Sequence, residues 1–87
     1  MNEADLHNFL VTMDRFECAG EQIPVHSEFD SGAILIGDEP NPYVLDEHRF
    51  CQIMVAAEKS LTVADVTAVL CSIYQHPRAY PGVVVRK

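Results

Sequence analysis

The chain contains no glycine-rich phosphate loop, no serine-hydrolase motif and no metalloprotease motif, and its four glycines are scattered. Phosphate-binding loops need clustered glycines directly before a helix, so the sequence gives no sign of this chemistry. We therefore expect a protein that is not an enzyme and that needs neither a cofactor nor a bound metal.

Long apolar runs are also absent. The longest uncharged stretch, residues 66–77, is about a dozen residues long, whereas a membrane helix needs roughly 20 apolar residues. Residues 1–5 have neither the basic nor the apolar part of a secretory signal. We therefore expect a soluble, cytoplasmic protein without membrane contact.

Cysteine is scarce, with Cys18, Cys51 and Cys71 at spacings that suggest no pairing. An odd number of cysteines favours reduced thiols over a disulfide framework. Cys18 lies beside Glu17, where we expect an exposed helix end, whereas Cys71 lies between apolar residues of a later helix. We therefore expect Cys71 to be buried and Cys18 to be exposed.

Basic residues are nearly missing from the first half of the chain. Residues 1–47 contain eleven acidic residues and the single base Arg15, which gives a charge of −10, whereas residues 48–87 carry +3 and the total is −7. A negative surface repels phosphate backbones and attracts basic surfaces over a Debye length of about 8 Å. The charge pattern predicts a basic protein partner and no direct binding of nucleic acid.

The overall composition is typical of one folded domain. Hydrophobic residues make up 48% of the sequence and charged residues 22%, as in ordinary globular proteins. A chain of 87 residues is too short to divide into domains but long enough for a modest core. We therefore treat residues 1–87 as a single domain.

The first segment has the pattern of an amphipathic helix. Asn2 is a suitable N-cap, and Gly20 is a suitable stop because glycine takes the left-handed conformation without steric cost. Between them, one stripe at helical period is apolar: Leu6, Phe9, Leu10, Met13 and Phe16. The pattern predicts a single helix that continues past Phe16.

Two short strands follow. Residues 22–28 and the apolar run 33–36 flank a turn at 30–32, which predicts a hairpin. Pro24 removes one ladder donor and places the first strand at an edge or a bulge. Residues 38–42 contain two prolines and two acids and predict an exposed loop, and residues 83–85 predict a terminal strand.

Two capped helices separate these strands. Asp46 is a candidate N-cap of the first, and Thr62 with Asp65 forms a capping-box pattern at the start of the second. The short connection around residues 59–60 favours an antiparallel αα-hairpin. The predicted fold is therefore α+β, of order αββααβ, with a small antiparallel sheet packed against helices.

The acidic half suggests a binding surface for a protein with a basic groove. The candidate residues come from the hairpin, the proline-rich loop and the next helix start: Glu28, Asp30, Asp38, Glu39, Asp46 and Glu47. An inhibitor or an adaptor would fit this charge. In composition alone, the chain is similar to small acidic proteins that mimic nucleic acid, as some phage-encoded inhibitors do.

A zinc- or thiol-dependent domain is the first alternative. His48 and Cys51 lie near the start of one predicted helix, and Cys71 and His76 near the end of the next, so an antiparallel hairpin would bring the four together. Their spacing matches no established zinc pattern. In the thiol variant, His48 and the helix start would lower the pKa of Cys51.

Self-association is the second alternative. A domain of this size has little interior, so part of the helical hairpin would stay exposed as an apolar patch and would favour a homodimer. The patch would comprise Phe50, Met54, Leu70, Ile73 and Tyr74. Unpaired strand edges would serve the same purpose.

Overall fold

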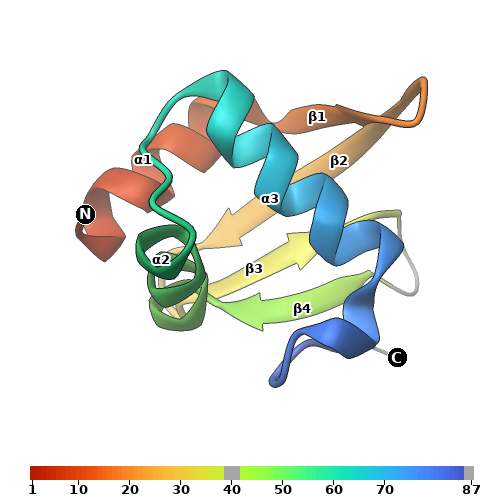
Figure 1. The fold of residues 1–87 in the computed structure, drawn as a ribbon. Helices are drawn as coiled ribbons and strands as arrows, with labels where there is room; N and C mark the ends of the chain where they lie inside the picture. The colour runs from red at the N-terminus through yellow and green to blue at the C-terminus, as the bar shows by residue number, and fades with distance from the viewer. Residues whose placement is uncertain (39–41, 86–87) are drawn as a thin grey trace.

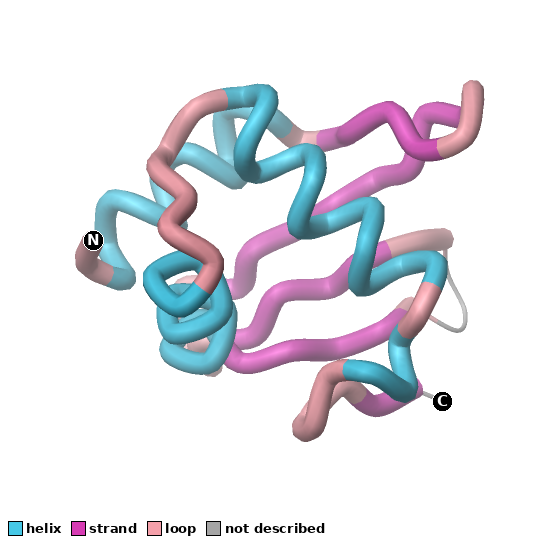
Figure 2. Tube along the Cα trace, in the orientation of Figure 1, coloured by secondary structure: helices cyan, strands magenta, loops and turns pink. Residues whose placement is uncertain are grey.

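A computed structural model describes residues 1–38 and 42–85 as an antiparallel sheet with helices on one face (Figures 1 and 2). The strands are β1 (Arg15–Cys18), β2 (Glu21–Glu28), β3 (Ala33–Ile36), β4 (Tyr43–Asp46) and β5 (Val84–Val85), and they lie in this order across the sheet. The helices are α1 (Glu3–Met13), α2 (Glu47–Ala56), α3 (Val63–Gln75) and the short 3-10 helix η1 (Pro77–Ala79). The predicted α+β class is confirmed, with two strands more than expected.

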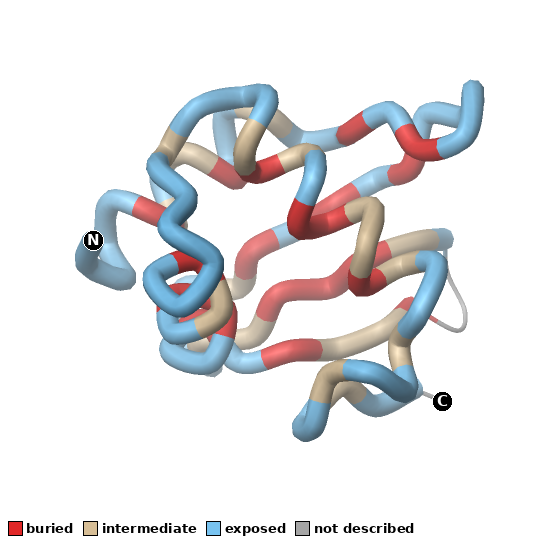
Figure 3. The backbone as a smooth tube through the Cα atoms, in the orientation of Figure 1, coloured by how far each residue is buried: buried red, intermediate tan, exposed pale blue. Residues whose placement is uncertain are grey.

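The core lies between the helices and one face of the sheet (Figure 3). Side chains alternate along β2, so Ile23, Val25 and Ser27 point inward and the residues between them are exposed. Aromatic rings link the layers, because Tyr74 of α3 lies edge-on to Phe16 of β1 and to Tyr43 of β4. Burial in this single core holds the sheet and the helices together.

The first helix ends earlier than predicted. Asp14 adopts the left-handed conformation with φ 53° and closes α1, since its N–H donates to the carbonyl of Leu10. Aspartate tolerates this conformation better than most residues. Phe16 is inward-facing in β1, and Gly20 forms the β1–β2 turn with Ala19, both with positive φ. The predicted helix was too long because Phe16 fits the apolar stripe of a helix as well as an inward position of a strand.

Pro24 lies inside the sheet, where β2 changes its pairing partner. Residues 21–24 pair with β1, and residues 25–28 pair with β3. The carbonyl of Pro24 still accepts a hydrogen bond from Gly37, but Pro24 has no N–H to return. The predicted edge position of this strand is therefore wrong, because β2 lies between β1 and β3. The missing N–H of Pro24 falls at the end of the β2–β3 ladder.

Strand β4 was not predicted. It pairs with β3 from Ile36–Tyr43 to Ala33–Asp46 and leads directly into α2. Asp46 caps α2 as predicted, because its carboxylate accepts the N–H groups of His48 and Arg49. Residues 39–41, and with them the candidate Glu39, lie outside the described residues.

The third helix also begins where its sequence signal placed it. Thr62 accepts the N–H of Asp65, and the Asp65 carboxylate accepts the N–H of Ser60. The Ser60 backbone hydrogen bond, which favours the charged form, lowers the pKa of Asp65. The expected capping box therefore operates with Ser60, instead of Thr62, as the backbone donor to the acid.

Helices α2 and α3 are consecutive, but they do not form an antiparallel pair. In Figure 1, α2 is seen nearly end-on, whereas α3 crosses the sheet. Helix α2 packs against α1 and β4, and α3 packs against β1. The predicted exposed patch is wrong for most of its members, because Phe50, Met54, Leu70 and Ile73 are fully buried.

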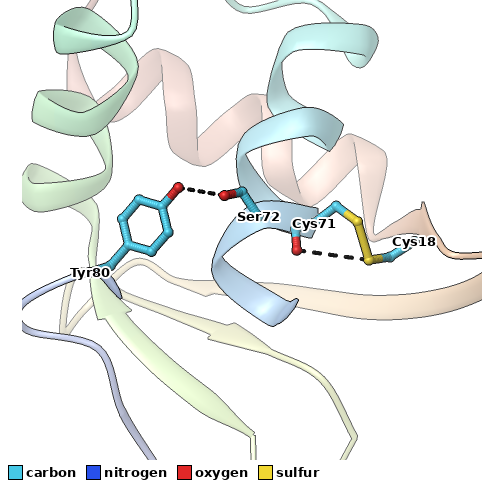
Figure 4. The surroundings of a disulfide bond; sticks show 4 residues. All are labelled: Cys18, Cys71, Ser72 and Tyr80. Atoms are coloured by element: carbon cyan, nitrogen blue, oxygen red, sulfur yellow. Dashed lines mark hydrogen bonds between the residues drawn. A yellow bond between two sulfur atoms is a disulfide. The ribbon is translucent and has the colours of Figure 1, made fainter. Parts of the chain in front are cut away.

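A disulfide joins Cys18 of β1 to Cys71 of α3, with their Cα atoms 5.3 Å apart (Figure 4). The expectation that all three thiols are reduced is therefore wrong, as is the expected exposure of Cys18, which is buried. Cys51 is the free, buried cysteine of the described chain. Nearby, the hydroxyl groups of Ser72 and Tyr80 share a hydrogen bond of 2.6 Å that ties the segment after α3 back onto it (Figure 4).

None of the helices in residues 1–38 and 42–85 has both the length and the apolar character that a membrane crossing needs.

Candidate functional site

The predicted acidic residues separate into two groups. Strand register places Glu28 and Asp46 on either side of Ala33, at the end of the sheet where the β2–β3 turn carries Asp30. Asp38 follows β3 at the opposite end of the sheet. The structure therefore does not bring all the described candidates onto one surface.

Two of these acids, Asp46 and Glu47, serve as a helix cap and as a buried group. The Asp46 carboxylate caps α2, and Glu47 is only 5% exposed, with its N–H bonded to the carbonyl of Gly32. A buried carboxylate presents little charge to a partner. Of the predicted set, Glu28 and Asp30 remain as neighbours on one surface, with Glu28 also accepting a hydrogen bond from Ser31.

Glu47 belongs to a polar network in the core with His7 and Ser27. The Ser27 hydroxyl donates to Oε2 of Glu47 at 2.8 Å, and Nδ1 of His7 lies 2.8 Å from the same hydroxyl. A serine hydroxyl has one proton, which goes to the carboxylate, so Nδ1 of His7 must carry a proton and donate to Ser27. The network joins polar side chains from three separate elements, α1, β2 and α2.

This network has the residue types of a hydrolase triad but a different connection. In a triad, histidine stands between the serine and the acid, whereas here Ser27 stands between His7 and Glu47. The Ser27 residue is also only 3% exposed, although it lines a surface hollow together with His7. The arrangement can position side chains, but it does not provide an activated nucleophile.

Above the network, the β2–β3 turn exposes an aromatic side chain. Phe29 is 73% exposed, and its ring lies edge-on to the ring of His7 at 5.1 Å. Val11, one helical turn after His7 on α1, is also exposed. Together with Glu28 and Asp30 they line an open hollow of about 520 Å³. We call Val11, Glu28, Phe29 and Asp30 the turn surface.

Two signals in the sequence pointed toward this site. Ser27 follows Ile23 and Val25 at the inward period of β2, and a polar residue at an inward position needs a buried partner. Phe29 lies in a turn between two acids, where an apolar side chain gains little burial. The partners of Ser27 come from distant segments, so the sequence alone could not identify them.

The four proposed zinc or thiol residues do not form a cluster. Cys71 is bonded to Cys18, and within residues 1–38 and 42–85 no three His, Cys, Asp or Glu side chains are placed to hold a metal ion. Nδ1 of His48 lies 3.6 Å from Oε2 of Glu3, and Nε2 of His48 is hydrogen-bonded to the side-chain amide of Gln52. Burial, followed by the charge of Glu3, raises the pKa of the Cys51 thiol. The predicted activation of Cys51 is therefore wrong.

No family model, curated protein or solved structure matches this chain. The function is therefore inferred from the geometry of the site alone.

Proposed function

We propose that this chain is a non-enzymatic protein-binding domain that recognises a basic partner through the turn surface. The observation that supports this most is the exposure of Phe29 between Glu28 and Asp30. Protein interfaces are enriched in aromatic anchors surrounded by a polar rim. An arginine or lysine of the partner would contact the face of the Phe29 ring and pair with the adjacent carboxylates.

The underlying core supports this role. Phe29 rests against His7, and the network of His7, Ser27 and Glu47 joins α1, β2 and α2 below it. An anchor on a rigid base loses less conformational freedom on binding than one on a loose loop. The charge of −10 over residues 1–47 would further accelerate encounter with a basic surface.

The biological role within this class is an inhibitor or an adaptor, and a viral inhibitor that mimics nucleic acid is one form of it. The cytoplasmic location stays a prediction. The Cys18–Cys71 disulfide is more typical of oxidising compartments. Alkylation of free thiols in intact cells, followed by mass spectrometry of the protein, would determine whether the bond exists in the native compartment.

The binding proposal is tested by affinity capture from the native source with four matched baits. These are the wild type, Phe29→Ser, Asp30→Asn and, as a control, Val84→Ser. The control removes another exposed apolar side chain, 58% exposed, from the edge strand β5, away from the turn surface. We expect a basic protein that is retained by the wild type and the control, reduced by Asp30→Asn and lost with Phe29→Ser. Equal retention by Phe29→Ser would overturn the proposal.

A further inference from the structure

We propose that two copies of this chain pair through the outer edges of their β1 strands, with Arg15 of each copy opposite Glu17 of the other. This surface is separate from the turn surface. Among the described residues, β1 is an edge strand with β2 as its neighbour. Both Arg15 and Glu17 are exposed on it. An unpaired edge is a ready template for another strand.

The hydrogen-bond pattern of the hairpin determines which backbone groups face outward. The Val25 N–H donates to the carbonyl of Asp14 at 3.0 Å, so Asp14–Val25 is a bonded position of the ladder. Bonded and non-bonded pairs alternate in antiparallel sheets. Arg15–Pro24 and Glu17–Gln22 are therefore non-bonded pairs, in agreement with the missing N–H of Pro24. The backbone N–H and C=O groups of Arg15 and Glu17 point away from β2.

The outward N–H and C=O groups of Arg15 and Glu17 can form hydrogen bonds with the same groups of a second copy. When two β1 strands align antiparallel with Phe16 on the two-fold axis, Arg15 of one copy lies opposite Glu17 of the second copy, and the reverse is also true. Both pairs then fall at positions where outward N–H and C=O groups meet. Opposite charges directly across a strand pair stabilise it, whereas like charges destabilise it. The short sequence of β1 is thus self-complementary in charge and in backbone pattern.

The surface beside the edge also favours a second copy. A groove of about 860 Å³ lies between α1, β1 and α3, with Phe9, Met13 and Val63 among its apolar lining residues. A two-fold axis perpendicular to the sheet keeps both helix layers on the same side. The two grooves would then face each other across the axis, and their apolar side chains would lose exposure to water. Closed two-fold dimers are the commonest oligomers.

The test is analytical ultracentrifugation of the oxidised full chain from about 1 µM to about 1 mM, a range that covers weak and moderate dimers. We expect the mass to rise from 9.7 kDa toward twice this value. Arg15→Glu and Glu17→Arg should each weaken dimerisation about tenfold, because each replaces two attractive pairs with two repulsive ones. The double variant Arg15→Glu/Glu17→Arg should return to within about twofold of the wild type, since it restores opposite charges in reversed order.

Two further variants keep the test specific. Glu21→Arg makes the same change of charge on β2 of the same hairpin and should leave dimerisation unchanged. Glu17→Pro removes an outward N–H but no β1–β2 bond, and it should abolish the dimer while the circular dichroism spectrum and the Cys18–Cys71 disulfide are retained. A monomer throughout the concentration range, or a double variant as weak as the single variants, would overturn the proposal.

Discussion

Ser27 donates a 2.8 Å hydrogen bond to Glu47, and this bond joins the inward face of β2 to the first turn of α2. Both residues are almost fully buried. Glu47 is the first residue of α2, directly after the Asp46 cap. The base of the turn surface therefore depends on a polar contact within an otherwise apolar core.

Removal of the Ser27 hydroxyl should lower the free energy of unfolding by about 1–3 kcal/mol, because it leaves the buried carboxylate of Glu47 and the partly buried Nδ1 of His7 without their partner. Urea denaturation of Ser27→Ala measures this loss. The control is Ser31→Ala, whose exposed hydroxyl bonds Glu28 and whose loss should cost less than about 0.5 kcal/mol. Equal midpoints for the two variants would contradict the role of the network.

Because a disulfide joins them, Cys18 and Cys71 should contribute equally to stability, although the sequence led us to expect one exposed and one buried cysteine. Cys18→Ser and Cys71→Ser should destabilise the fold by similar amounts, about 2–4 kcal/mol, because either change opens the same loop between residues 53 positions apart. Reducing agent should lower the thermal midpoint of the wild type and leave both variants unchanged. A much larger effect of Cys71→Ser than of Cys18→Ser would show that the two thiols act separately.

Asp46 should affect stability more than binding. Asp46→Ala removes the N-cap of α2 and should cost about 1 kcal/mol, whereas Asp46→Asn should retain most of the stability because asparagine is also a good N-cap. Thermal denaturation distinguishes the two. Asp30→Ala, at an exposed turn position, serves as the control with little expected change. A destabilisation by Asp30→Ala as large as that by Asp46→Ala would remove the distinction between the two acids.

The raised pKa of Cys51 gives a dependence on pH. Burial raises the pKa of the Cys51 thiol in the folded state above its value in the unfolded state. The stability that the neutral, buried thiol contributes is therefore fully present below the unfolded-state pKa and is lost as the pH rises through the folded-state pKa. Iodoacetamide should therefore label Cys51 in the native protein with a half-maximal rate at a higher pH than in denaturant. A native midpoint at lower pH would indicate an activated thiol and would contradict the burial argument.

Local sequence signals determined the helix starts well. Asp46 and Thr62 cap α2 and α3 as predicted, since a cap depends only on residues two or three positions away. The end of α1 was misplaced because Phe16 satisfies both a helical stripe and an inward strand position. Strand β4 was missed because it directly precedes α2, with Asp46 read only as a helix cap, and because it forms by pairing with β3 and β5.

The site was harder to predict than the fold. Cys18 and Cys71 are 53 positions apart, and nothing in their local sequences specifies that they meet. His7, Ser27 and Glu47 come from three elements, and only the inward position of Ser27 is visible in the sequence pattern. Glu47 was therefore interpreted as a surface acid, although tertiary packing buries it.

The central claim is that acidic side chains around Phe29 attract a basic partner. Its most direct test is the association rate with the captured partner at low and moderate salt. We compare the wild type with Glu28→Gln/Asp30→Asn and with Glu58→Gln, an exposed acid outside the turn surface. We expect the wild-type association rate to fall as salt rises, and only the double variant to associate more slowly and with a weaker salt dependence. An association rate independent of salt, or an equal effect of the Glu58 variant, would contradict it.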